Sequence, residues 1–148
     1  MSKIISFRGK LDSGAQEKIK LSTLKGKVGY KIIKFETMPD TPGTNQTESM
    51  VKIYNEFQSS VDALVDFDDY TMLAARFQAI ANGSNEAYAT ALETIFDNAV
   101  TNQDIFITAI ELTAGRPTNY YIELETMALS SQQATQLTLQ SIRTLAEQ

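Results

Sequence analysis

The stretch NYYIELETMAL, residues 119–129, alternates apolar and polar side chains, which is typical of a β-strand with one buried face. Tyr120, Ile122 and Leu124 fall on one face of this strand, and Tyr121, Glu123 and Glu125 fall on the other. A sheet built from such strands buries one side against a second layer and leaves its other side in water. The stretch therefore predicts a layered β-fold.

The rest of the chain repeats this pattern. Period-two alternation predicts strands at residues 3–10, 17–22, 28–38, 48–57, 93–98 and 103–112. We interpret residues 71–81, whose spacing fits a helix or a strand, as a strand or a helical turn leading into one, and residues 64–70 as a short strand with an acidic turn. Residues 39–47, 82–88 and 99–102 carry turn signals. Many short strands separated by turns predict an all-β protein, an antiparallel β-sandwich of the jelly-roll kind.

The chain ends with SSQQATQLTLQSIRTLAEQ, residues 130–148, which predicts an amphipathic helix. Ser130 and Gln133 have the spacing of a capping box. We expect residues 1–129 to form the sandwich and residues 130–148 to form a helix of the same domain. The candidate interface residues on this helix are Leu137, Ile142, Leu145 and Arg143. Its polar face consists mostly of Thr and Gln, so the helix can pack against another chain without burying charge, or it can cap its own sandwich.

The composition limits the chemistry. The chain has 148 residues with no Cys and no His, which excludes disulfides, thiolate nucleophiles and the commonest general base. We therefore expect no cofactor and no enzymatic activity. The sequence shows no membrane-spanning segment and no apolar region typical of a signal peptide, which predicts a protein that is made and assembled inside a cell.

The charges are distributed unevenly along the chain. Residues 1–34 hold nine of the thirteen basic residues and two acids, a net charge of +7, whereas the remaining 114 residues carry −12. The candidate basic contact surface is formed by Lys3, Arg8, Lys10, Lys18, Lys20, Lys25 and Lys27. We expect this surface to meet an acidic neighbouring subunit, for which an identical copy is suited. Contact with nucleic acid is a less favoured alternative.

Two groups of carboxylates are candidate sites. Asp66, Asp68 and Asp69 are close in sequence, but an EF-hand loop starting at Asp66 would require Gly where Thr71 stands and Glu where Phe77 stands. We interpret the group as a solvated acidic turn and leave open a cation at a subunit contact.

Catalysis by two carboxylates would need a defined separation. Glu123 and Glu125 are about 7 Å apart along a strand, with Glu111 as a candidate neighbour, which is a weak signal.

Several longer segments carry a family resemblance. These are IKLSTLKGKVGYKIIKFETMPDTPG (residues 19–43), VKIY (51–54), VDFDDYTMLAA (65–75), IFDNAVTNQDIFI (95–107), YYIELETMAL (120–129) and ATQLTLQSIR (134–143). Together they resemble a family of small structural proteins from the virions of marine phages and viruses. The resemblance implies no catalytic residue. It implies a small capsid, cement or vertex component that assembles with itself and with other virion proteins in the host cytoplasm. The alternative is a nucleic-acid- or glycan-binding module of a virus.

Overall fold

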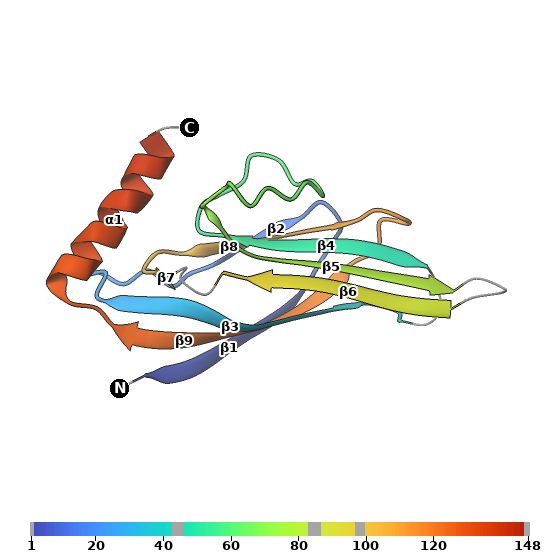
Figure 1. Cartoon of the computed structure of the whole chain (residues 1–148), viewed down its shortest axis with the longest axis horizontal. Coiled ribbons are helices and arrows are strands. Elements are labelled where there is room, and N and C mark those ends of the chain that lie inside the picture. The colour runs from blue at the N-terminus through green and yellow to red at the C-terminus, as the bar shows by residue number, and fades with distance from the viewer. Residues whose placement is uncertain (1, 43–45, 83–86, 97–99, 147–148) are drawn as a thin grey trace.

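The computed structural model shows two antiparallel β-sheets packed face to face, with one helix at the end of the chain (Figure 1). It describes residues 2–42, 46–82, 87–96 and 100–146, and the backbone alone at 81, 82, 87–89, 141 and 143–146. The elements are β1 (Lys3–Leu11), β2 (Gln16–Ile19), β3 (Val28–Pro39), β4 (Thr47–Tyr54), β5 (Met72–Asn82), β6 (Ala87–Ile95), β7 (Val100–Thr101), β8 (Ile105–Glu111), β9 (Thr118–Ala128) and α1 (Ser131–Ala146).

The strand order is that of a jelly roll. One sheet has the order β1-β9-β3-β7, and the other has the order β2-β8-β4-β5-β6. First and last strands pair in a nested way: β1 with β9, β2 with β8, β3 with β7, and β4 with β5. The chain is thus one long hairpin with its turn between β4 and β5, rolled so that its arms alternate between the sheets. β6 adds a strand outside β5. The predicted fold class is confirmed.

The core lies between the two sheets and uses the apolar faces that alternation predicts. On β9, Tyr120, Ile122 and Leu124 are buried, whereas Glu123 and Glu125 on the opposite face are partly exposed. The largest fully buried side chains include Phe35 of β3, which is paired with Ile122 in the same sheet, and Ile107 of β8 in the other sheet. All belong to one apolar cluster, which is the main source of stability expected for a sandwich.

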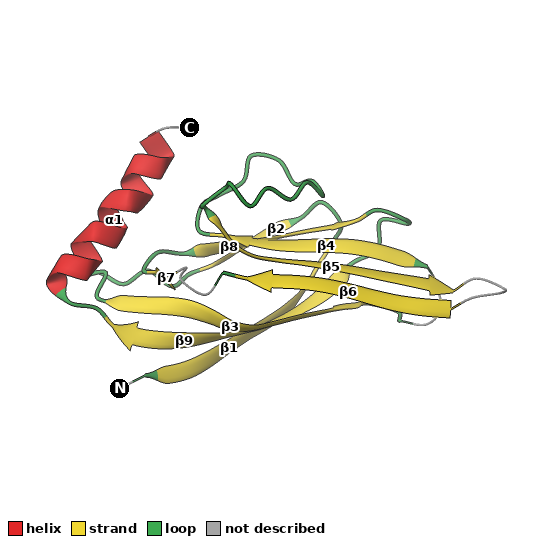
Figure 2. Ribbon diagram, in the orientation of Figure 1, coloured by secondary structure: helices red, strands yellow, loops and turns green. Residues whose placement is uncertain are grey.

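The five-stranded sheet departs from the simple pattern on its outer side. Residues 55–71 form a long loop on the outside of this sheet (Figure 2), and β4 is buried on both faces. The prediction of a short strand within residues 64–70 was wrong, because the loop contains no strand. The side chains of Asp66 and Asp69 instead accept hydrogen bonds from the amides of Asp68 and Thr71, which favours turns over an extended chain.

Two other ambiguous segments become strands. Residues 71–81 lie almost entirely in β5, as the strand interpretation predicted. Residues 99–102 were predicted as a turn. Residue 99 lies outside the described residues, and the prediction was wrong for residues 100 and 101, because β7 pairs Thr101 with Tyr30 and Val100 with Lys31. Two residues give no measurable periodicity, so this strand exists only through its tertiary pairing.

Helix α1 starts as the sequence predicts. The amide of Ser130 donates to Gln133 Oε1 at 3.0 Å, and the amide of Gln133 donates to Ser130 Oγ at 3.1 Å, so the capping box is confirmed. The helix then extends away from the sandwich (Figure 1). Within the described part of the chain, no helix is long and apolar enough to cross a membrane.

Candidate binding groove and contact surfaces

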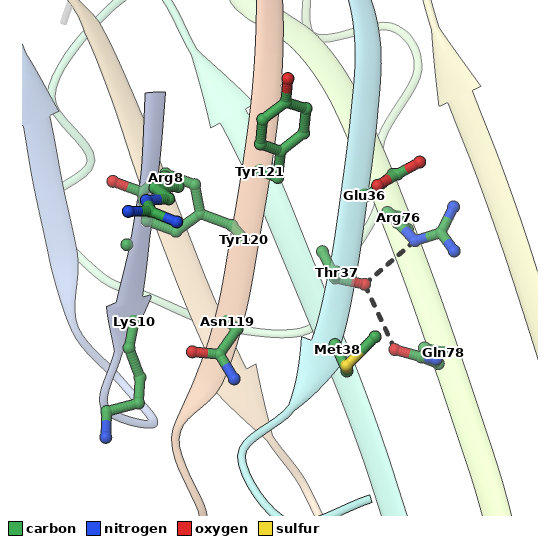
Figure 3. A pocket seen from close by; sticks show the side chains of 11 residues that line it. Arg8, Lys10, Glu36, Thr37, Met38, Arg76, Gln78, Asn119, Tyr120 and Tyr121 are labelled. Carbon is green, nitrogen blue, oxygen red and sulfur yellow. Dashed lines mark hydrogen bonds between the residues drawn. The ribbon is translucent and has the colours of Figure 1, made fainter. Parts of the chain in front are cut away.

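An open groove of about 920 Å³ lies along the four-stranded sheet, and we call it the Tyr121 groove (Figure 3). Its lining comes from four strands: Arg8, Gly9 and Lys10 of β1, Glu36, Thr37 and Met38 of β3, Arg76 and Gln78 of β5, and Asn119, Tyr120 and Tyr121 of β9. The β5 residues belong to the other sheet and reach this side past β3. The groove therefore spans both layers of the sandwich.

Basic side chains dominate the charge of the groove. Arg8, Lys10 and Arg76 line it against a single acid, Glu36. Arg76 is already fixed, because its Nε donates to Thr37 Oγ1 at 3.0 Å and its Nη1 lies 3.4 Å from a carboxylate oxygen of Glu93. The exposed side chains of Arg8 and Lys10 remain available for an anionic or strongly polar ligand.

Tyr121 supplies an aromatic surface in this setting. Its hydroxyl donates to Glu123 Oε1 at 2.8 Å, which raises the pKa of Tyr121 by stabilising the protonated phenol. Lys34 Nζ lies 5.9 Å from the ring centroid. Strand pairing places Arg8 and Glu36 directly beside it on either side. This arrangement can hold a sugar or base ring against Tyr121, and it contains no nucleophile paired with a base.

The floor of the groove is held by Tyr120. Its hydroxyl donates to Glu17 Oε2 at 2.9 Å, and burial together with this carboxylate raises the pKa of Tyr120. A Cβ at Gly9 would stand 2.8 Å from the Tyr120 hydroxyl oxygen, so a larger residue at this position would displace the Tyr120 ring.

The predicted basic surface is divided between two places. Lys3, Arg8, Lys10, Lys18, Lys20, Lys25 and Lys27 are all exposed. Arg8 and Lys10 line the Tyr121 groove, whereas Lys25 and Lys27 line a second groove of about 250 Å³ beside α1. We call the second one the helix-base groove; its other lining residues are Ser131, Ala134, Thr135, Thr138 and Leu139. Lys18 of β2 pairs with Asp104 at 3.3 Å, and Asp104 also accepts the amides of Leu21 and Ser22 in the chain between β2 and β3.

The predicted interface residues of the helix are only partly described. Ile142 is 57% exposed, whereas Leu137 is half-buried. The side chains of Arg143 and Leu145 lie outside the described residues. Sequence reasoning missed Leu139, which is 55% exposed, because the stripe through Leu137 placed it on the polar side.

The base of α1 is anchored by Asn102, a residue that the sequence does not single out. Asn102 is buried, and its amide nitrogen lies 3.0 Å from the Gly26 carbonyl oxygen, 3.3 Å from the Ala134 carbonyl oxygen and 3.1 Å from Thr138 Oγ1. One side chain thus joins the loop before β3 to the helix. The signal was hidden because a buried Asn can be recognised only from its partners.

Replacing Asn102 with Ala should loosen this joint. We expect the free energy of unfolding to fall by about 2 kcal/mol, because the carbonyl groups of Gly26 and Ala134 lose a buried donor. Amide hydrogen exchange in residues 134–140 should become faster at the same time. Gln132→Ala, at an exposed position of the same helix, is the matched control. Equal exchange in the two variants would contradict the anchoring role.

The acidic turn shows no metal-binding geometry. The Oδ1 atoms of Asp66 and Asp69 accept backbone amides at 2.9 and 3.0 Å. Across the described residues, no group of three or more Asp and Glu side chains is placed to hold a metal ion. The arrangement fits the interpretation as a solvated acidic turn.

The strand carboxylates do not form a two-carboxylate centre. Glu123 and Glu125 share the outer face of β9, where they neighbour Lys34 and Lys31 across the strand pair, and neither lines the Tyr121 groove. The expectation that Glu111 neighbours them was wrong. Glu111 lies on β8 of the other sheet, and its carboxylate binds backbone amides.

The outer loop, residues 55–71, exposes several large apolar side chains to solvent. Within residues 55–71, several large apolar side chains are exposed: Phe57 (62%), Leu64 (72%), Phe67 (53%) and Tyr70 (89%). Beneath them lies Lys52 of β4, whose side chain is buried and whose Nζ lies 3.0 Å from Asp62 Oδ1 and 2.6 Å from the Leu64 carbonyl oxygen. The loop thus covers Lys52 and keeps its side chain away from solvent.

Comparisons with known proteins give loose structural matches. Neither a protein-family model nor a curated protein sequence matches the chain. A solved structure titled as the VP1 protein of Trichodysplasia spinulosa-associated polyomavirus in complex with 3'-sialyllactose matches with a TM-score of 0.40 and 6% identity, over 84% of this chain and 93% of that one. A structure titled Desmodium yellow mottle tymovirus matches with a TM-score of 0.35 and 10% identity, over 87% and 89% of the two chains. The assignment of the fold rests on this chain's own strand order and pairing.

Proposed function

We propose that the protein is a viral structural protein, a small capsid, cement or vertex component that assembles with copies of itself and with other virion proteins. The observation that carries this proposal is the exposure of four large apolar side chains within the 55–71 loop: Phe57, Leu64, Phe67 and Tyr70. Contact between several large apolar side chains and water is unfavourable, and a partner that covers them removes this cost. A rigid jelly roll that presents such a surface is suited to contact between subunits.

Other features support the same proposal. The helix extends from the sandwich with exposed Leu139 and Ile142, and the sequence segments described above resemble those of small virion proteins. In this proposal the sandwich and the helix work as one domain, the protein is located in the virion after assembly in the host cytoplasm, and it carries out no catalytic step.

Assembly of the purified protein tests the proposal directly. We expect sedimentation velocity to show species larger than the 16.4 kDa monomer, increasing with concentration, and the protein to co-purify with virus particles. A strictly monomeric protein that is absent from purified particles would contradict the proposal.

The Tyr121 groove favours a second candidate function, a module that binds glycan or nucleic acid. Its exposed cations and its aromatic ring are groups that hold either ligand. Arg8→Glu/Lys10→Glu should reduce retention of single-stranded DNA at low salt at least tenfold, whereas the matched Lys25→Glu/Lys27→Glu variant should retain it. Negligible binding by the unmodified protein at low salt would rule out the nucleic-acid version.

A further inference from the structure

We infer that the 55–71 loop of one copy docks into the helix-base groove of a neighbouring copy. The inference rests on the proposed assembly role, and it identifies the two surfaces through which copies would contact each other. Both surfaces expose apolar side chains, and their charges are opposite. They lie on different parts of the molecule, since the loop lies over the five-stranded sheet and the helix stands beyond the end of the sandwich (Figure 1).

The loop is the acidic partner. Asp66 and Asp68 are exposed on either side of Phe67, and Tyr70, at 89% exposed, follows them. No basic residue lies between residues 53 and 75, so this surface is negative throughout. Acidic side chains around an exposed aromatic ring favour a partner that has an apolar groove with basic side chains at its edge.

The helix-base groove has that composition. Ala134 and Leu139 supply apolar lining, and Lys25 and Lys27 supply the basic rim. Leu24, next to this rim, is fully exposed and has no apolar cover within the described structure. The salt bridges found among the described residues involve neither of these lysines and neither Asp66 nor Asp68. These charges are therefore available to a second copy.

Both surfaces are held in place before contact. The loop is fixed by the Lys52–Asp62 pair and by Phe67, whose ring packs edge-on against Phe96 at 5.2 Å. The groove is fixed by Asn102 and by Asp104, which accepts the amides of the chain just before Leu24. Ordered surfaces lose less conformational entropy on binding.

The contact joins two different surfaces, so it is head-to-tail. Such contacts repeat from copy to copy and build a ring if the rotation closes. An open chain of copies would present one free loop at one end and one free groove at the other until the ring closes. If the rotation does not close, the same contact builds a filament.

A charge exchange between two variants tests the inference. Lys25→Glu/Lys27→Glu makes the groove acidic, and Asp66→Lys/Asp68→Lys makes the loop basic. Each variant alone should associate at least about tenfold more weakly, because like charges face each other. Mixed in equal amounts, the two variants should associate with each other, since both loop-groove contacts between them again join opposite charges. Sedimentation velocity of the single and mixed samples measures this directly.

Control variants separate docking from other effects. Lys3→Glu and Asp12→Lys, at exposed positions outside both surfaces, should change association by less than about twofold. Asp66→Asn/Asp68→Asn keeps the side-chain oxygen that forms the turn and removes the charge, so it should weaken association without disturbing the loop. If this neutral variant associates like the unmodified protein, the charges do not carry the contact.

The outcomes of these experiments distinguish a failure of the docking inference from a failure of the proposed structural role. If the unmodified protein assembles but the mixed variants do not associate, the docking inference is overturned and the structural role stands. If the variants self-assemble normally but are lost from particles, the two surfaces meet another virion protein and not a second copy, which also overturns the inference. If the unmodified protein neither assembles nor joins particles, the proposed function itself fails.

Discussion

Replacing Glu111 with Gln should lower the free energy of unfolding by about 3 kcal/mol at pH 7. The Glu111 side chain is buried, and its carboxylate accepts the backbone amides of Glu48 (3.1 Å), Thr113 (2.8 Å), Ala114 (2.7 Å) and Arg116 (3.1 Å). Each carboxylate oxygen accepts two of these amides and Gln keeps only one acceptor oxygen, so two of the amides lose their partner. Thermal or denaturant unfolding measures the loss.

The dependence of this effect on pH identifies its cause. Burial alone would raise the pKa of Glu111, but the four amides outweigh it and lower the pKa from 4.5 to about 2. A lowered folded-state pKa gives stability that is complete above about pH 4.5 and is lost as the pH falls towards 2. The difference between the unmodified protein and Glu111→Gln should therefore shrink over this range and nearly vanish at its lower end.

Glu36→Gln is the matched control for this prediction. Glu36 is exposed and lies 3.5 Å from Lys34, so its replacement should change the free energy of unfolding by less than about 0.5 kcal/mol. A Glu111→Gln variant that loses as little as this control, or whose loss does not change with pH, would show that the amide contacts are not a major source of stability.

Replacing Lys52 with Ala should cost about 3 kcal/mol and release the outer loop. The ammonium of Lys52 is the buried donor to Asp62 and to the Leu64 carbonyl group, and its stem fills space between β4 and the loop. Its Nζ also lies 5.6 Å from the Tyr54 ring centroid. The variant removes the donor and leaves a cavity under the loop.

Lys52→Met separates the two contributions. Met keeps most of the apolar volume but cannot donate, so we expect a smaller loss, about 1–2 kcal/mol. Hydrogen exchange in residues 60–66 should become faster in both variants and stay unchanged in Lys20→Met, at an exposed lysine elsewhere. Unchanged exchange in the Lys52 variants would mean that other contacts hold the loop, such as its ring contacts and the hydrogen bonds between Gln58 and Gln16 of β2.

The fold was predictable from the sequence because its signal is local. Apolar and polar side chains alternate along β9, and the same period-two pattern occurs in β1 and β3. This pattern predicts a sandwich in which one face of each sheet is buried. The capping box of α1 was equally local and equally accurate. These features depend on neighbours within a few residues, which a single sequence contains.

The sites were less predictable because they depend on distant partners. Glu111, Lys52 and Asn102 are ordinary polar residues in the sequence, and each has at least one partner 10 or more positions away. The Tyr121 groove likewise joins four strands, of which only the basic residues of β1 were candidates beforehand. The charge of each surface could be predicted from its side chains, but the location of each surface depends on the strand topology.

The nested pairing of the strands sets the timing of folding. β9 lies between β1 and β3, so the four-stranded sheet cannot close until the last strand has left the ribosome. The groove beside α1 needs this sheet as well as the helix that directly follows β9. A chain in which β9 or α1 has not yet emerged consequently lacks this groove, because the groove is lined by residues of the helix and of the segment before β3.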